Sequence, residues 1–310
     1  MLVKHTIFLY VWEDKNMAIF EGAAVALVTP FYENGEINFE ELEKYVDFHV
    51  DNHTDAIVVC GTTGEPATMT TEEHLECIKV VTDRVNHRIP VIAGTGSNDT
   101  RFGIELTRKA YELGVDATLQ VTPYYNKTTQ KGLVEHFKAI GTAVDLPMIV
   151  YSVPSRTGVT IQPKTAYELS KFDFVQGIKD ATGNLSGVAE IAELCGDALP
   201  IYSGNDDQVL PVLSLGGKGV ISVLSNVAPQ QTHDMVRAYL DGDHKTALSL
   251  QLKYIPLIKA LFSEVSPIPV KAALNLMGME AGPCRLPLTS MEPANLEVLK
   301  KALIDVEILK

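Results

Sequence analysis

The chain has 310 residues, of which 46% are hydrophobic and 21% are charged, as in globular proteins. This composition excludes a disordered or collagen-like chain, and the length allows one large domain or two ordinary ones. Because 26 Lys and Arg residues face 39 Asp and Glu residues, the formal net charge is −13, and nucleic acids and anionic membranes are not expected partners.

Residues 1–16 are predicted to be an N-terminal extension that lies outside the fold. Their single apolar run, residues 6–12, is too short to cross a membrane. A secretory signal peptide would need a longer apolar core and a cleavage site of small residues, whereas the polar residues 13–16 follow this run. We therefore expect the fold to begin at Met17 and the protein to act in the cytoplasm.

From Gly22 to about residue 225, short apolar runs alternate with longer amphipathic stretches, and no polar or Pro/Gly-rich linker interrupts them. Eight runs are nearly continuous in apolar residues, which is typical of parallel strands that are buried on both faces. The predicted strands cover residues 23–29, 56–60, 91–93, 117–121, 148–151, 174–178, 199–202 and 219–222.

Eight helices are predicted between and after these strands, and two of them begin with clear capping signals. Thr70 and Asn38 supply capping oxygens, and acidic residues follow each of them in the first helical turn. The predicted helices cover residues 39–51, 71–86, 100–113, 130–143, 163–170, 185–194, 207–215 and 230–240. Eight strands, each followed by a helix, predict an α/β fold, a closed (β/α)8 TIM barrel over residues 17–240; a doubly wound open sheet is the alternative.

The last part of the chain, residues 241–310, is predicted to be a C-terminal helical appendage that packs against the barrel. Its apolar pattern indicates helices over residues 244–262, 269–277 and 295–308. These segments are too long for a simple tail, and we expect them to supply contacts between subunits.

The cysteines suggest neither a disulfide framework nor a metal site. No two of them form a C-x-x-C pair, and none has zinc-ligand spacing with any of the eight histidines. We interpret them as buried free thiols of a protein in a reducing cytoplasm. They are Cys60, Cys77, Cys195 and Cys284.

Lys179 is the most informative candidate for chemistry. In a TIM barrel the catalytic groups stand at the carboxyl ends of the strands, and Lys179 directly follows the apolar run 174–178. Burial disfavours the ammonium and lowers the pKa of a lysine, which yields the neutral amine that attacks a carbonyl. We therefore predict that Lys179 forms a Schiff base; a structural ion pair with Asp180 or Glu65 is the alternative.

Three further candidates stand at neighbouring strand ends. Tyr151 ends the preceding strand, where its phenol could transfer protons near the amine or simply belong to the core. The turn Gly-Thr-Thr-Gly at 61–64 offers hydroxyls and backbone N–H groups for a carboxylate or a proton relay, with a phosphate loop as the alternative. Arg156 offers a guanidinium that recognises a carboxylate, unless it is a surface arginine.

The sequence contains neither a metal-ligand pattern nor a nucleotide-binding motif. His74 and His136 are isolated on predicted helices, and Gly94-Thr-Gly96 lacks the third glycine of a dinucleotide-binding loop. We therefore expect no cofactor and no bound metal. Together the candidate residues favour an imine-forming class I lyase that acts on a small keto acid.

Five motifs at these strand ends resemble the dihydrodipicolinate synthase family, which also contains N-acetylneuraminate lyase and related 2-keto acid aldolases. They are G-T-T-G-E at 61–65, P-Y-Y-N at 123–126, Y-S-V-P-S-R-T-G at 151–158, G-I-K-D-A-T-G-N at 177–184 and S-G-N-D at 203–206. The resemblance runs from about Ile19 to the C-terminus. It implies a cofactor-free condensation of pyruvate with L-aspartate 4-semialdehyde to 4-hydroxy-tetrahydrodipicolinate, the first committed step of the diaminopimelate and lysine pathway.

The resemblance also implies roles for individual residues. Lys179 would form the imine with pyruvate, and Tyr151 would donate and accept protons. Thr63 and Tyr125 would complete the proton relay. Because Tyr125 in this family reaches into the neighbouring subunit's site, the resemblance implies a homo-oligomer, a tetramer built as a dimer of dimers. The residues implied to hold the substrates are Thr62, Thr63, Gly204 and Ile221 for pyruvate, and Arg156 for the carboxylate of aspartate semialdehyde.

Two alternative functions are compared with this one. A sialic-acid or 2-keto-3-deoxy-sugar-acid lyase would use the same imine chemistry, but Arg156 suits a short substrate that ends in a carboxylate better than a sugar acid. A non-catalytic binding barrel would have no reason to keep Lys179, Tyr151 and Thr63 together.

Lysine-inhibited relatives bind lysine in a cleft between two subunits, and this chain carries part of that pattern as a remnant effector site. The matching residues are His74, Asn98 and Tyr124. The departures, where sensitive enzymes carry a serine, a histidine and a glutamate, are Pro66, Thr71 and Phe102. Because Phe102 offers no carboxylate to an amino group, we expect feedback by lysine to be weak or absent.

Overall fold

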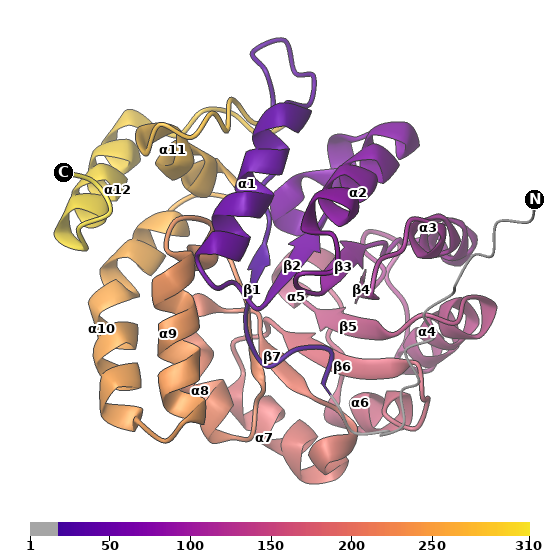
Figure 1. Cartoon of the computed structure of the whole chain (residues 1–310). Helices are drawn as coiled ribbons and strands as arrows, with labels where there is room; N and C mark the ends of the chain where they lie inside the picture. Colours follow the sequence, from indigo (N-terminus) through magenta and orange to yellow (C-terminus); the bar gives the residue numbers. More distant parts are fainter. Residues whose placement is uncertain (1–17) are drawn as a thin grey trace, which may run out of the picture.

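The computed structural model describes residues 18–310, so the predicted extension over residues 1–16 lies outside the described residues. Eight parallel strands form a closed barrel, in the order β1 to β8, and helices surround it (Figure 1). The strands are β1 Gly22–Ala26, β2 Ala56–Val59, β3 Val91–Gly94, β4 Ala117–Val121, β5 Met148–Ser152, β6 Val175–Asp180, β7 Ile201–Ser203 and β8 Gly219–Ser222. The predicted TIM barrel is confirmed, and the open sheet is wrong because β8 pairs with β1.

The barrel helices follow their strands in the predicted alternation. They are α1 Phe39–Asp51, α2 Thr71–Val85, α3 Thr100–Glu112, α4 Gln130–Ala143, α5 Pro154–Thr157, α6 Pro163–Leu169, α7 Leu185–Cys195, α8 Val209–Ser214 and α9 Pro229–Leu240. Short 3₁₀ helices lie at η1 Thr62–Gly64, η2 Pro66–Thr68, η3 Gly196–Ala198, η4 Asp206–Gln208 and η5 Leu224–Asn226.

Capping decides where several of these helices begin. The Thr70 side chain accepts a hydrogen bond from Glu73 N, and the Glu73 carboxylate accepts one from Thr70 N, which completes a capping box on α2. The predicted helix over residues 207–215 is instead divided into η4 and α8. Pro211, which has no backbone N–H, thereby sits in the first turn of α8, where that group needs no helical partner.

The barrel closes where β1 meets β8, at two facing glycines. Gly22 pairs with Gly219, and a Cβ added at Gly219 would lie 1.9 Å from the carbonyl oxygen of Gly22. Only glycine therefore permits this approach of the two strands.

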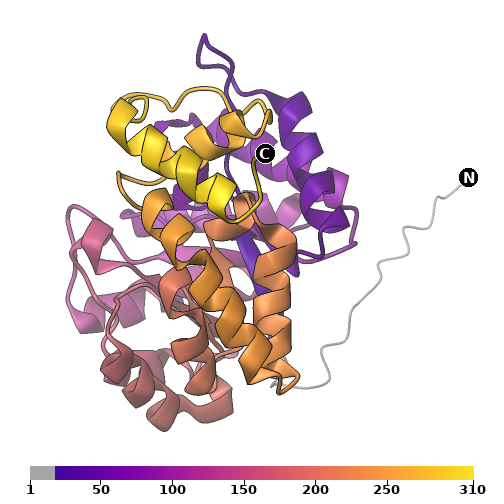
Figure 2. The ribbon, with the colours of Figure 1, turned by 90° about the vertical axis from the view of Figure 1, so that its left-hand side faces the viewer.

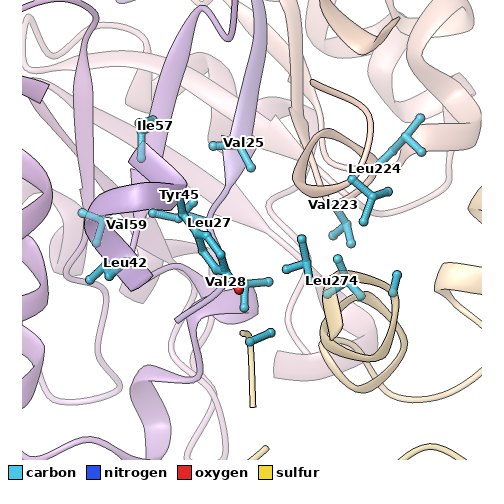
Figure 3. Packing of buried hydrophobic residues seen from close by; sticks show 14 of the residues in the cluster. Val25, Leu27, Val28, Leu42, Tyr45, Ile57, Val59, Val223, Leu224 and Leu274 are labelled. Atoms are coloured by element: carbon cyan, nitrogen blue, oxygen red, sulfur yellow. The ribbon is translucent and has the colours of Figure 1, made fainter. Parts of the chain in front are cut away.

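The C-terminal helical region, residues 241–310, contains α10 His244–Leu261, α11 Ile268–Leu276 and α12 Pro293–Asp305. These helices lie on one side of the barrel, with α10 beside α9 (Figures 1 and 2). Figure 3 shows that Leu274 of α11 belongs to the same buried cluster as Val25 of β1 and Ile57 of β2. The region therefore shares its core with the barrel.

All four cysteines are free; Cys284 is half-buried, and the other three are buried. The prediction of buried free thiols is confirmed for these three. Among the helices of residues 18–310, none combines the length and the apolar character that a membrane crossing requires.

Candidate active site

A cavity of about 360 Å³ opens among the loops that follow the carboxyl ends of the strands. Its walls come from the ends of several strands and from residues 262–266, which join α10 to α11. The sequence-predicted residues that line it are Thr62, Thr63, Tyr151, Arg156, Lys179 and Gly204. The closed barrel thus brings together residues that lie up to 142 positions apart in the chain.

Lys179 projects into this cavity from β6, which is longer than predicted and includes it. The strand register pairs Lys179 with Tyr151 of β5, and the Lys179 Nζ lies 4.4 Å from the centre of the Tyr151 ring. Only 5% of Lys179 is exposed. The two predicted catalytic side chains are therefore adjacent, as residues at neighbouring parallel strand ends should be.

The alternative partners of Lys179 are engaged elsewhere. Glu65 forms an ion pair with Lys271, at 3.1 Å, and Asp180 Oδ1 accepts hydrogen bonds from the backbone and the hydroxyl of Thr182. In the part of the chain that the structure describes, no ion pair joins Lys179 to a carboxylate. Its ammonium thus lacks the contact that would keep it protonated.

Burial lowers the pKa of Lys179 to about 8. The charge of Asp206 opposes this shift, and the guanidinium of Arg156 adds to it. About a tenth of the amine is therefore neutral at pH 7, far more than for an ordinary lysine, and the neutral form is the one that attacks a carbonyl carbon.

Tyr151 has the opposite property. Burial raises the pKa of its phenol to about 12, an effect that the charge of Arg156 reduces and that of Asp180 increases. The phenol therefore remains protonated at neutral pH, and it can donate a proton beside the amine of Lys179.

The turn that carries Thr62 and Thr63 is the 3₁₀ helix η1, and two non-glycine residues in the left-handed region flank it. Cys60 has a φ of 53° and Glu65 has a φ of 57°. A Cβ added at Gly64 would lie 3.2 Å from Leu27 O, so this part of the turn packs closely against the backbone after β1. The turn is thus held in a conformation that few sequences adopt freely.

Arg156 reaches the rim of the cavity from α5, a single helical turn that the sequence did not predict. Its Nη2 donates a hydrogen bond to Ser266 O at 2.8 Å. Ser266 belongs to residues 262–266, of which Phe262, Glu264 and Val265 also line the cavity. One wall of the site therefore comes from the C-terminal helical region, and no local sequence signal indicated this.

Gly204 is close to Lys179, because a Cβ added there would lie 3.1 Å from Lys179 Cε. Ile221 is buried in the core of the barrel and does not line the cavity. Tyr125 is 93% exposed, with a φ of 66°, and lines neither this cavity nor its neighbour. Within a single chain, these two predicted residues thus stand apart from the others.

Asp206 has no role in the sequence prediction, although it belongs to the S-G-N-D motif after β7. Its carboxylate is buried, and Oδ2 accepts hydrogen bonds from Val223 N and Leu224 N, each at 3.0 Å. Oδ1 has no hydrogen-bond partner among residues 18–310. Burial raises the pKa of Asp206, and its hydrogen bonds and Lys179 oppose that shift. It is thus a carboxylate close enough to influence the amine.

A second cavity of about 410 Å³ shares Thr62, Tyr151 and Arg156 with the first. The predicted effector residues that line it are His74 and Tyr124, and the departures that line it are Pro66 and Phe102. His74 Nε2 lies 2.9 Å from Gly94 O, and burial lowers the pKa of this histidine. Asn98 and Thr71 do not line the cavity.

Over residues 18–310, no three His, Cys, Asp or Glu side chains are grouped so that they could hold a metal ion.

Comparison with known proteins gives a consistent set of relatives. The profile of the Dihydrodipicolinate synthetase family matches residues 19–305. The 4-hydroxy-tetrahydrodipicolinate synthase of Caldicellulosiruptor saccharolyticus is 60% identical over 289 residues, which cover 93% of this chain and 98% of that protein. The enzyme of the same name from Clostridium tetani is 54% identical, over 95% of this chain and 100% of the relative.

Solved structures agree with this. The dihydrodipicolinate synthase of Aquifex aeolicus is 46% identical and has a TM-score of 0.91, over 93% of this chain and 99% of that one. The structure of the Cyanidioschyzon merolae enzyme with lysine bound is 41% identical and has a TM-score of 0.92, over 94% of this chain and 100% of that one.

Proposed function

The chain belongs to the dihydrodipicolinate synthetase family, and on that premise we propose that it is a 4-hydroxy-tetrahydrodipicolinate synthase, a lyase of lysine biosynthesis. It condenses pyruvate with L-aspartate 4-semialdehyde. One observation carries the proposal: the amine of Lys179 is buried beside the phenol of Tyr151. Burial lowers the pKa of this amine to about 8.

The reaction proceeds through an imine on Lys179. The neutral Nζ attacks C2 of pyruvate, water leaves, and an iminium forms; loss of a proton from C3 then gives an enamine. The C3 carbon of the enamine forms a bond to the aldehyde carbon of the semialdehyde. Finally the amino group of that substrate attacks C2, the ring closes, and Lys179 is released. The iminium withdraws electrons from C3, so the chain's own lysine supplies the activation.

The residues around Lys179 transfer protons and bind the two substrates. Tyr151 transfers the protons, because its phenol stays protonated and lies against the amine. Thr62, Thr63 and the backbone near Gly204, which line the cavity, hold pyruvate. Arg156 binds the carboxylate of the semialdehyde, and its bond to Ser266 O fixes the guanidinium at the rim.

This function is favoured over a sugar-acid lyase by one feature of the rim. Arg156 presents a cation where a short second substrate ends, whereas a polyhydroxylated acid would need several neutral hydrogen-bond partners there. The relatives at 54 to 60% identity carry the name of the synthase.

The working unit is proposed to be a homotetramer, a dimer of dimers, in the cytoplasm. Tyr125 supports the oligomer, because a tyrosine that is 93% exposed in one chain is available to a second chain's site. The four free cysteines suit a reducing compartment. Sedimentation velocity of the wild type and of Tyr125→Ala tests the assembly; a fully active monomer would contradict it.

The central test traps the imine. The protein is incubated with pyruvate and reduced with borohydride, and the mass increment is mapped to a peptide. We expect the adduct on Lys179 and none in Lys179→Arg. An unmodified wild-type protein would overturn the proposal.

The second substrate is tested by exchange. Aspartate semialdehyde and N-acetylmannosamine are offered in turn to the pyruvate-loaded enzyme, and product formation is followed. We expect turnover with the semialdehyde; turnover with the sugar alone would establish the sugar-acid lyase instead.

Feedback by lysine is proposed to be weak or absent. Phe102, which is 40% exposed, lines the second cavity and offers no carboxylate to the amino group of a bound lysine. Assays over a range of added L-lysine test this, and clear inhibition at micromolar concentrations would contradict it.

A further inference from the structure

A second buried lysine lies outside the cavity, in the C-terminal helical region. Lys271 of α11 is only 1% exposed, and its Nζ lies 3.1 Å from Glu65 Oε1. Both side chains are 2% exposed, so the ion pair is almost free of solvent. Its partner, Glu65, directly follows η1, the turn that carries Thr62 and Thr63.

Both carboxylate oxygens of Glu65 are bound by the C-terminal helical region. Oε1 faces Lys271, and Oε2 accepts a hydrogen bond from Arg285 N at 3.0 Å. Lys271 Nζ also donates to Pro283 O, at 2.6 Å. The same ammonium lies 4.1 Å from the centre of the Phe31 ring. The pair is therefore fixed in direction as well as in distance.

The backbone of Glu65 closes η1. Its N–H donates to Thr62 O at 3.2 Å, and its carbonyl accepts hydrogen bonds from the backbone and the hydroxyl of Thr68, at 3.2 and 3.1 Å. The φ of 57° is unfavourable for a residue with a side chain, so the surroundings must hold it. Besides these local backbone hydrogen bonds, the contacts from the C-terminal helical region reach Glu65 through its side chain.

Arg285 strengthens the attachment to the barrel. Its guanidinium donates to Thr68 O at 2.9 Å and to Gly35 O at 2.7 and 2.9 Å. It also pairs with Glu73 of α2. The segment after α11 is thereby tied to the loop after β1, to η2 and to α2, all of which surround the Thr62 and Thr63 turn.

We propose that the Glu65–Lys271 ion pair is a positioning device that holds the Thr62 and Thr63 turn in the conformation that catalysis requires. The proposal rests on the proposed function, because it assumes that this turn binds pyruvate and relays protons. Lys271 lines neither cavity and touches no reacting atom. It acts through Glu65, so the C-terminal helical region contributes to turnover from outside the site.

A buried ion pair of this kind contributes more to the orientation of Glu65 than to the stability of the fold. Replacing a whole buried ion pair with neutral groups of similar size is often tolerated by the fold, because desolvation offsets the attraction between the charges. A neutral pair would keep the packing but lose the directional attraction that holds Glu65. Small displacements of a site residue reduce turnover by up to about a hundredfold.

The experiment therefore removes both charges at once. The double variant Glu65→Gln/Lys271→Met contains no lone buried charge, and Lys271→Met is measured beside it. Lys301→Met is the matched control, because Lys301 forms an exposed pair with Asp305 on α12 of the same region. For each protein we measure kcat, KM for pyruvate, the borohydride adduct, and exchange of the pyruvate methyl protons in D2O.

We expect the double variant to fold and to form the adduct on Lys179 at saturating pyruvate. Its kcat should fall about tenfold to a hundredfold, with slower methyl-proton exchange, whereas Lys301→Met should match the wild type. Wild-type kcat and exchange in the double variant would overturn the proposal. Failure of the double variant to fold would also overturn it, since the pair would then serve stability. A wild type without an adduct would instead refute the proposed function.

Discussion

Two lysines are buried within residues 18–310, and they differ in what faces the ammonium. Lys179 and Lys271 are 5% and 1% exposed, and each lies over an aromatic ring, Tyr151 at 4.4 Å and Phe31 at 4.1 Å. Burial lowers the pKa of both amines. Only Lys271 has a carboxylate in direct contact, and Glu65 opposes the shift there. The two lysines therefore share burial but differ in surroundings: Lys271 is held by an ion pair, whereas Lys179 faces an open cavity.

The largest expected effect is the loss of turnover when Lys179, but not Lys271, is replaced. Lys179→Met should lower kcat by at least about 10⁴-fold, because the nucleophile is lost. It should also abolish the borohydride adduct, whereas Lys271→Met should retain the adduct at saturating pyruvate. Mass spectrometry of the reduced proteins and a coupled assay measure both. Loss of the adduct in a folded Lys271→Met protein would erase the distinction between the two sites.

The next effect concerns stability. Lys271→Met leaves the carboxylate of Glu65 buried without its ion-pair partner, which should lower the free energy of unfolding by about 3 to 5 kcal/mol. Denaturant titration measures this, and adding Glu65→Gln should recover most of the loss. Lys301→Met, at an exposed pair, should change the free energy of unfolding by less than about 1 kcal/mol.

Lys179→Met should change the free energy of unfolding in the opposite direction from Lys271→Met. A fall in pKa from 10.5 to about 8 means that the buried ammonium of Lys179 destabilises the fold below pH 8, by about 3 kcal/mol in the limit. Lys179→Met should therefore raise the free energy of unfolding at pH 7 by about 1 to 3 kcal/mol.

The pH dependence of this gain follows from proton binding. Between pH 8 and 10.5 the unfolded chain binds a proton that the folded chain has lost, so the wild type gains stability as pH rises through this window. The advantage of Lys179→Met should thus shrink toward pH 10. Denaturant titrations of the wild type and of Lys179→Met at pH 7 and pH 10 test this. An equal difference in the free energy of unfolding at both pH values would contradict the lowered pKa of Lys179.

Imine formation should follow the neutral fraction of Lys179. Because the pKa is lowered to about 8, the rate at low pyruvate should rise by up to about tenfold per pH unit below pH 8 and level off above it. Rapid-mixing measurements from pH 6 to pH 9.5 can follow this rise. A rate that still rises steeply at pH 9.5 would show that the pKa of Lys179 is not lowered.

The smallest effect tests Asp206, a buried carboxylate whose charge acts on Lys179. Asp206→Asn removes a charge that raises the pKa of Lys179, so the midpoint of the pH profile should move down, by about one pH unit or less. Asp207→Asn, at the exposed neighbouring position, serves as the control and should leave the midpoint unchanged. An unchanged midpoint in Asp206→Asn would show that Asp206 does not act on the amine.

The sequence was sufficient to predict Lys179 but not Lys271, for a physical reason. Lys179 interrupts a continuous apolar run at a strand end, and parallel strands bring their carboxyl ends together, so the pattern predicts both its burial and its neighbour Tyr151. Lys271 lies on a helix, where one lysine among apolar residues indicates a solvated edge. Its burial depends on Glu65, 206 positions away, and the hydrophobic periodicity of a helix does not predict such a long-range contact.

The same reasoning explains the other omissions. The strands and most helices were predicted to within one to three residues, because their periodicity is local. Residues 262–266 form a wall of the site only because α10 and α11 fold back onto the barrel, and Asp206 matters through the backbone amides of Val223 and Leu224 in the next loop. Such contacts depend on tertiary structure alone.

The wall formed by residues 262–266 has a consequence for the protein during its synthesis. The last barrel strand ends at Ser222, so a ribosome that has translated the barrel has already made Lys179 and Tyr151. The wall, Lys271 and Arg285 leave the exit tunnel later. Until they do, the nascent chain carries Lys179 and Tyr151 without the residues that form this wall of the cavity.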